Sequence, residues 1–156
     1  MKRFLTVLAA AAAVVLACAF VACKNDDDGG SGGGGSVVSK WGYVTMWYTG
    51  RPVPDENDYK INTMMVFTFY SGGKVDVKYN SSPAYGNDLY TGKYTGDTTK
   101  PGATIKLDVV CDNDERVFTG TVTDGGNLIE FSDWMSKPED AGTQSAYQTY
   151  YIGKIQ

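Results

Sequence analysis

Histidine, the side chain that most often acts as a general base and commonly binds metal ions, is absent from this 156-residue sequence. Its absence excludes Ser-His-Asp and Cys-His catalytic sites. The sequence also lacks a Cys-x-x-Cys pair and a glycine-rich phosphate loop. A pair of carboxylates placed by the fold, as in glycosidases, stays open, although nothing in the sequence points to it. We therefore predict a protein that is not an enzyme and holds no cofactor.

Two clusters of oxygen-bearing side chains come closest to a metal site, at residues 55–58 and 112–115. Both are rich in Asp and Asn, whose oxygens Ca²⁺ prefers, but neither has the spacing and the glycine of a calcium loop. Asp and Asn are also the residues that turns prefer. We interpret both clusters as turns and predict no metal site.

Cysteine is scarce, with only Cys18, Cys23 and Cys111 in the chain. The first two lie in or beside the N-terminal apolar segment, so only Cys111 belongs to the part that should fold. No internal disulfide can form if Cys23 is acylated, although an exported protein would meet a compartment that permits one. We predict that Cys111 is a small buried hydrophobic side chain.

The N-terminus has the pattern of a secretory signal. Met1-Lys2-Arg3 is positively charged, and residues 4–22 form an uncharged apolar run. The alternative is a transmembrane anchor, because a run of this length just spans the hydrocarbon core. Its richness in alanine, and the charged residues that follow Cys23, favour a signal peptide over residues 1–22.

The end of this signal, Val21-Ala22-Cys23, resembles the lipobox of bacterial lipoproteins. Cys18 is an alternative lipidation site, but Cys23 is favoured because the charged run Lys24-Asn25-Asp26-Asp27-Asp28 follows it and leaves a bilayer readily. The resemblance implies a diacylglycerol on the Cys23 sulfur and an acylated amine, and two or more chains give stable anchoring. It also implies export and attachment to the outer membrane, facing either the periplasm or the cell surface.

Residues 23–36 comprise the lipidated Cys23 and a segment, 24–36, without an apolar side chain, so we predict a flexible tether with a reach on the order of 20 Å. The acidic run within it resembles a surface-export signal of some outer-membrane lipoproteins. Cleavage after residue 22 would leave twelve basic against eighteen acidic residues, a net charge of −6. An acidic domain of this kind is a poor partner for nucleic acid.

Residues 37–156 differ in composition from the N-terminal part. They contain short runs rich in Tyr, Trp, Phe, Val and Thr, in which apolar and polar residues alternate. Gly, Asn, Asp and Pro separate these runs, which is typical of strands joined by tight turns. We predict an all-β domain with eight strands and antiparallel neighbours. The expected strands are residues 38–49, 61–70, 74–80, 89–96, 103–111, 115–123, 128–132 and 146–155.

Eight such strands can close into a small barrel in which the first and last strands pair, and a two-sheet sandwich is the alternative. The segment Lys40-Trp41-Gly42-Tyr43 and the repeated units Tyr90-Thr91-Gly92 and Tyr94-Thr95-Gly96 resemble those of lipocalin-like bacterial lipoprotein domains. The resemblance implies an eight-stranded up-and-down β-barrel whose interior holds a small apolar ligand.

Aromatic residues are the most suggestive feature for function. They either fill the core of a small barrel or line a pocket for an apolar or glycan-like ligand. Gly92, Gly120 and Gly153, expected on the inner face, either permit coiling of the strands or leave room for that ligand. The alternative function is a surface module for protein–protein interaction, such as an adhesin or a subunit of an outer-membrane complex. The expected ligand-lining residues are Tyr43, Trp47, Phe67, Phe69, Tyr94, Phe118, Tyr147 and Tyr151.

Overall fold

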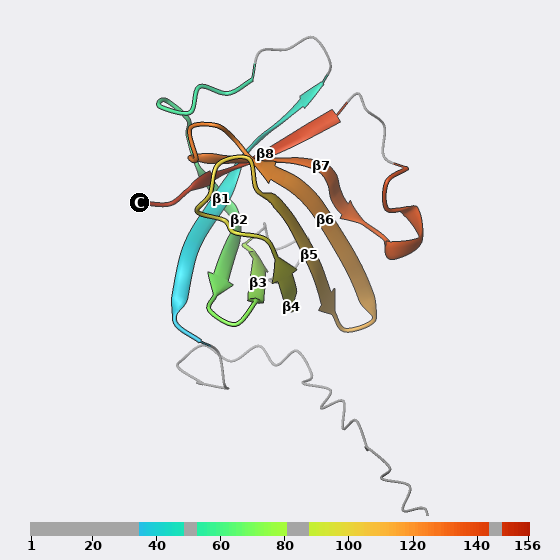
Figure 1. Cartoon of the computed structure of the whole chain (residues 1–156). Helices are drawn as coiled ribbons and strands as arrows, with labels where there is room; N and C mark the ends of the chain where they lie inside the picture. Colours follow the sequence, from blue (N-terminus) through green and yellow to red (C-terminus); the bar gives the residue numbers. More distant parts are fainter. Residues whose placement is uncertain (1–34, 49–52, 81–87, 144–147) are drawn as a thin grey trace, which may run out of the picture.

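The structure is a computed structural model that describes residues 35–48, 53–80, 88–143 and 148–156. Eight antiparallel strands form one closed barrel in meander order, which confirms the predicted all-β barrel and excludes the sandwich (Figure 1). The strands are β1 (Val37–Tyr48), β2 (Asn62–Tyr70), β3 (Lys74–Tyr79), β4 (Leu89–Thr95), β5 (Thr104–Cys111), β6 (Asp114–Val122), β7 (Leu128–Ser136) and β8 (Gln148–Lys154).

β1 closes the barrel because it pairs with both β2 and β8. Trp41 lies opposite Phe67 of β2 on one side and opposite Lys154 of β8 on the other. Closure gives every strand a neighbour on both sides, which removes most of the edge that could recruit another chain. Register shifts interrupt β1 next to Tyr43 on both sides, and such bulges increase the twist that a small barrel needs.

β7 runs to Ser136, four residues beyond the predicted end at Ser132. The alternation of apolar and polar residues breaks at Ser132 and Asp133, so the sequence pattern ends there. In the structure β7 shifts register against β6 at this point, and the shift returns Trp134 to the inner face. A short 3₁₀ turn, Pro138–Asp140, follows β7 inside the predicted polar loop.

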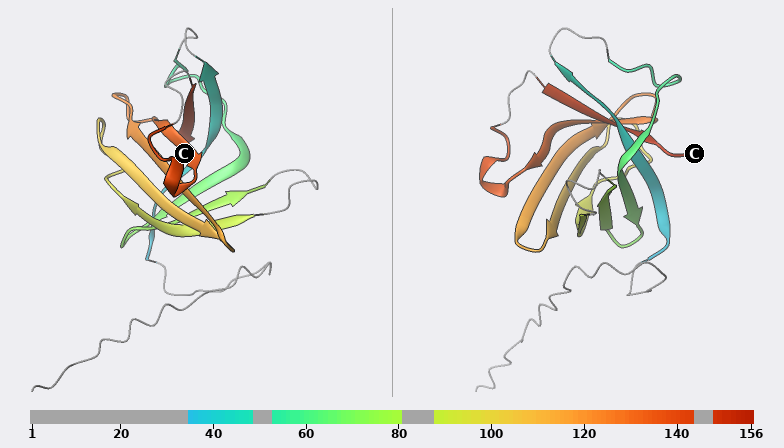
Figure 2. Two further views of the ribbon diagram at one scale, coloured as in Figure 1. Left: turned by 90° about the vertical axis from the view of Figure 1, so that its right-hand side faces the viewer. Right: turned by 180° about the vertical axis from the view of Figure 1, so that it is seen from behind.

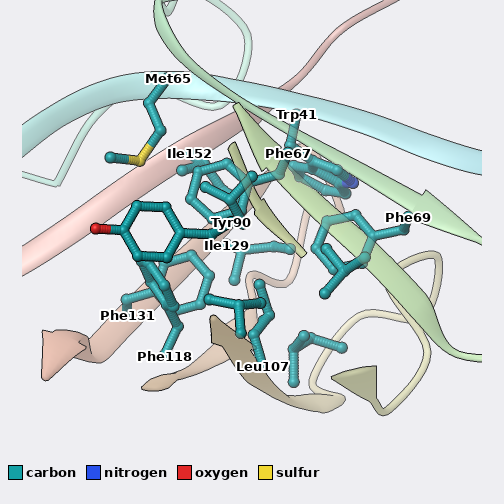
Figure 3. Close-up of a cluster of buried hydrophobic side chains, with 14 of the residues drawn as sticks. Trp41, Met65, Phe67, Phe69, Tyr90, Leu107, Phe118, Ile129, Phe131 and Ile152 are labelled. Carbon is teal, nitrogen blue, oxygen red and sulfur yellow. The ribbon is translucent and has the colours of Figure 1, made fainter. Parts of the chain in front are cut away.

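The centre of the barrel is filled by side chains. Trp41, Phe67 and Phe69 are fully buried, and Phe67 packs edge-on against Phe118 with ring centroids 5.6 Å apart. Figure 3 shows these apolar side chains pointing toward one another, with the hydroxyl of Tyr90 directed away from the cluster. Burial of each large apolar side chain contributes about 1.5–3 kcal/mol. The core therefore fixes which face of every strand points inward.

The two ends of the barrel differ. Turns 71–73, 96–103 and 123–127 lie at one end, here called the closed end, together with the C-terminus (Figure 1, left side). There the indole N–H of Trp41 donates to the hydroxyl of Ser39 over 2.9 Å, and that hydroxyl lies 2.8 Å from the hydroxyl of Thr98. All three side chains are buried. The opposite end, here called the mouth, has turn 112–113 and loop 137–143.

Two inward glycines bring strands close together. A Cβ atom at Gly92 would collide with the backbone of β5 at Asp108, and one at Gly120 would meet the carbonyl oxygen of Glu130 in β7 at 2.5 Å. Their space is taken by neighbouring backbone, so they serve the coiling of the strands. The prediction that Gly153 points inward is wrong: it lies under the ring of Tyr59, on the outer face.

Residues 53–61, the described part of the connection from β1 to β2, run over the outside of the barrel and are here called the strap (Figure 2). The carboxylate of Glu56 accepts backbone N–H bonds from Gly125 and Asn127 over 3.2 and 3.3 Å. The hydroxyl of Tyr59 donates to the carbonyl of Lys154 over 2.9 Å. The strap therefore covers the outer face of β8 and joins it to the closed end.

Candidate functional site

Three predicted ligand-lining residues are part of the core. Phe67, Phe69 and Phe118 are between 0 and 1% exposed and contact other core side chains rather than an open space. Tyr94 also faces inward, where it packs edge-on against Phe69 with ring centroids 4.9 Å apart. Its hydroxyl donates to the carbonyl of Tyr70 next to turn 71–73, so Tyr94 belongs to the closed end.

Tyr151 was expected inside the barrel, and this placement is wrong. Ile152 belongs to the core cluster and Tyr150 packs against it, so Tyr151 between them points outward. Tyr151 is nevertheless buried, and its hydroxyl donates to the carboxylate of Glu130 over 2.9 Å. The alternation of polar and apolar residues in β8 is weak, because Tyr150, Tyr151 and Ile152 are consecutive large side chains, and it therefore misassigned the faces.

Several predictions fall outside the described residues. These are the signal peptide over residues 1–22, the lipidation sites Cys23 and Cys18, most of the tether, and Tyr147. The side chain of Trp47 also lies outside them. The described part of the chain contains no helix long and apolar enough to cross a membrane.

Toward the mouth, a group of aromatic rings is only partly buried. The indole of Trp134 stacks on the ring of Tyr150, with centroids 4.9 Å apart and planes within 5°. Tyr43, one of the predicted residues, adds a third ring whose centroid lies 5.9 Å from that of Trp134. Trp134 also meets Phe118 edge-on at 5.2 Å, so the pair rests on the core. We call Trp134, Tyr150 and Tyr43 the aromatic platform.

Beside the platform, a charged side chain points into the barrel. Arg116 lies opposite Val109, which is buried, and two residues before Phe118 on the same face of β6. Its Nε donates to Asp114 over 3.0 Å and its Nη2 lies 2.8 Å from the other oxygen of that carboxylate. Tyr90 donates its hydroxyl to Asp114 over 2.6 Å. This network ends the apolar core at the mouth.

The pKa values of the network follow from these contacts. Hydrogen bonds from Tyr90 and then Arg116 lower the pKa of the Asp114 carboxyl, with a smaller effect from the charge of Lys137. Burial, followed by the bond to Asp114, raises the pKa of Tyr90. The bond to Asp114 raises the pKa of Arg116, with a minor contribution from the nearby Tyr90 oxygen. Asp114 is therefore a weak base whose oxygens are already occupied, which suits binding better than proton transfer.

Met135 carries backbone strain at the same place. Its φ is 48°, in the left-handed region that costs a residue with a Cβ about 1–2 kcal/mol. Its carbonyl accepts a hydrogen bond from Nη1 of Arg116 over 3.1 Å. Strained residues of this kind cluster at functional sites. The strained residue is therefore in direct contact with Arg116, the one arginine within the described strands.

Sequence reasoning missed most of this site, although one signal was present. The pattern that placed Phe118, Gly120 and Val122 on one face of β6 extends back to Arg116. Trp134 was missed because the pattern of β7 breaks before it. The pairing of Tyr90 with Asp114 joins residues 24 positions apart, and no local pattern predicts it.

Within the described ranges, no three His, Cys, Asp or Glu side chains lie close enough together to hold a metal ion. Comparison of the chain with known proteins found no matching family model, no matching curated protein and no matching solved structure.

Proposed function

We propose that this chain is an exported, membrane-anchored lipoprotein, without enzymatic activity, whose barrel binds a small apolar or glycan-like ligand at the mouth. One observation carries the binding proposal: the stacked Trp134 and Tyr150 are partly exposed beside an inward Arg116, in a barrel whose centre is otherwise filled. Aromatic faces bind both sugar rings and apolar molecules, and a few placed polar groups orient them.

The mouth is favoured over the centre of the barrel because of packing. Trp41, Phe67 and Phe131 are all fully buried across the middle of the barrel. A ligand there would have to displace several of them, each at a cost of a few kcal/mol. At the mouth, Trp134 and Tyr43 already present accessible surface.

Trp41 and Trp134, the two tryptophans whose side chains the structure describes, provide a direct test. The full-length protein, purified in detergent, is titrated with uncharged mono- and disaccharides and with uncharged aromatic and aliphatic alcohols, while the indole N–H signals are followed by NMR. We expect a binder to shift the signal of Trp134 and to leave that of Trp41, which lies buried at the closed end, unchanged. Single Trp→Phe variants assign the signals.

A shift of the Trp41 signal would instead place the ligand in the centre of the barrel. If neither signal responds to any probe of the panel, binding of an uncharged ligand at the mouth is refuted. A Tyr150→Leu variant, which removes one face of the stacked pair, should weaken a genuine binder by about tenfold, a loss of about 1.4 kcal/mol.

The anchor is supported by the resemblance of Val21-Ala22-Cys23 to a lipobox, and the described chain begins at the closed end. The amide of Ser71, in the turn at the closed end, donates to the carbonyl of Ser36 over 2.8 Å. A tether that arrives at the closed end leaves the mouth on the side away from its attachment. We expect Cys23→Ser to abolish labelling by radioactive palmitate and Cys18→Ser to leave it unchanged. Unchanged labelling of Cys23→Ser would move the site.

A second function, docking to another protein, is favoured by one separate observation. Met64, Leu89 and Val110 are between 37 and 41% exposed on the outer faces of β2, β4 and β5. If this surface binds a partner, a complex crosslinked on intact cells should disappear when the three residues are changed to Ser, while ligand binding at the mouth persists. Crosslinking that yields no complex argues against this function.

A further inference from the structure

In the network of Arg116, Asp114 and Tyr90, the group with N–H donors to spare is Arg116. Asp114 already accepts bonds from Tyr90 and from two nitrogens of Arg116. The only hydroxyl proton of Tyr90 is already engaged in the hydrogen bond to Asp114. A guanidinium carries five N–H donors, and those of Arg116 reach Asp114 twice and the carbonyl of Met135 once. The Tyr90 oxygen takes at most one of the other two, so at least one donor remains.

The charge of Arg116 is paired with that of Asp114, so the two charges of the network cancel. Lys137, Asp112 and Glu115 are all exposed, where solvent screens their charges. Asp133, beside Trp134, already accepts the backbone N–H of Gly142. An anionic ligand would therefore be bound by the remaining N–H donors of Arg116 and not by a surplus of positive charge.

We propose that the mouth selects a ring compound that carries one carboxylate, with Arg116 binding the carboxylate and the aromatic platform contacting the ring. This inference rests on the proposed function of the mouth and names its ligand class. A sugar acid and an aromatic acid share this chemistry. Both place a flat or apolar ring face next to a group that accepts hydrogen bonds from a guanidinium, whose charge-assisted bonds are the stronger ones.

The test compares acids with neutral molecules of the same shape. Methyl β-glucuronide is paired with methyl β-glucoside, and phenylacetate with phenylacetamide, in titrations of the full-length protein in detergent, followed at the Trp134 signal. We expect the acid of at least one pair to bind about tenfold more tightly than its neutral partner. The pair that shows the preference identifies the source as sugar or aromatic. Added salt should weaken the acid alone.

Two variants separate this role of Arg116 from a merely structural one. Asp114→Asn removes the competing charge but keeps an oxygen for Tyr90 and Arg116, so it should bind the acid severalfold more tightly and the neutral partner equally. Arg116→Lys keeps the charge but loses the planar fork, and should weaken the acid about tenfold. A structural role predicts that both variants bind both partners less well.

Failure of this inference can be told from failure of the proposed function. If neutral and acidic partners bind equally, or if Asp114→Asn brings no gain for the acid, carboxylate selection is overturned while ligand binding at the platform stands. If none of the four compounds moves the Trp134 signal but an uncharged probe of the earlier panel does, the inference is again overturned. If no compound of either panel does so, the proposed function fails with it.

Discussion

The ring of Tyr59, in the strap, lies directly on Gly153 of β8, and a Cβ atom at Gly153 would collide with it. The hydroxyl of the same Tyr59 donates to the carbonyl of Lys154, the next residue of β8. The outer face of β8 is therefore a packed surface, built from residues that neighbour each other only in the folded barrel.

We expect Gly153→Ala to destabilise the barrel by about 1–3 kcal/mol, because the added methyl group overpacks the contact with Tyr59. Urea unfolding of the purified protein measures the loss. The matched test is the Tyr59→Ala background, where the ring is gone and the cost of Gly153→Ala should fall. Equal costs in both backgrounds would show that the strap does not press on β8 in solution.

The buried polar group at the closed end should be sensitive to Ser39. Ser39→Ala removes the oxygen that accepts the Trp41 indole N–H and contacts Thr98, which is only 1% exposed. Buried groups left unsatisfied cost about 1–3 kcal/mol, so thermal unfolding should show a loss of that size. Ser36→Ala serves as the control, because its 3.4 Å contact with Ser71 is exposed. Similar losses for the two variants would contradict the assignment.

Acid stability should depend on Asp114. Hydrogen bonds from Tyr90, and then Arg116, lower its pKa in the folded chain. Its contribution to stability is therefore fully present above the unfolded pKa of about 3.9 and is lost as the pH falls through the lower folded value. The melting temperature of Asp114→Asn should fall less steeply below about pH 4 than that of the unmodified protein.

Asp97 provides the comparison for this experiment. Its pKa is also lowered, by hydrogen bonds from Thr99, and it lies in the turn after β4, at the opposite end of the barrel from the mouth network. In the double variant with Asp97→Asn, the melting temperature should fall still less steeply below about pH 4 than in either single variant, because the two sites share no partner. If the melting temperature of Asp114→Asn falls with pH as steeply as that of the unmodified protein, the network contributes nothing to acid stability.

The turn between β5 and β6 contains a second test of backbone strain. Asp112 has a φ of 52°, whereas the following Asn113 is not in the positive region. Glycine adopts positive φ without the steric cost that a Cβ brings. We expect Asp112→Gly to stabilise the barrel by about 0.5–1 kcal/mol and Asn113→Gly to bring no gain, as measured by urea unfolding. A gain at Asn113 alone would place the left-handed residue elsewhere.

The predicted strands agree with the observed ones wherever one face is buried and the alternation is unbroken. β5 is the clearest case, with Ile105, Leu107 and Val109 buried and the residues between them exposed. Alternation with a period of two leaves only one way to bury such a strand. Where bulges or consecutive large residues interrupt the pattern, in β7 and β8, the end of one strand and the inner face of the other were predicted wrongly.

The candidate site could be predicted only in part. Tyr43 was expected to line the ligand site and belongs to the aromatic platform, while Phe67 and Phe118 are core residues beneath it. Composition alone does not distinguish an aromatic side chain that fills a core from one that lines a pocket, because both are apolar and inward. The difference depends on distance from the mouth, which is a property of the assembled barrel.

The order and number of the strands, their antiparallel pairing and the inward position of most core residues follow from the sequence, because local alternation and turn residues act over a few positions. The contact of Tyr90 with Asp114 and the seat of Tyr59 on Gly153 were decided only by the tertiary structure. The first contact joins β4 to β6 across β5, and the second brings the strap onto β8, so the two contacts unite residues that are 24 and 94 positions apart. Such contacts result from packing of the whole sheet, so no short segment of the chain encodes them.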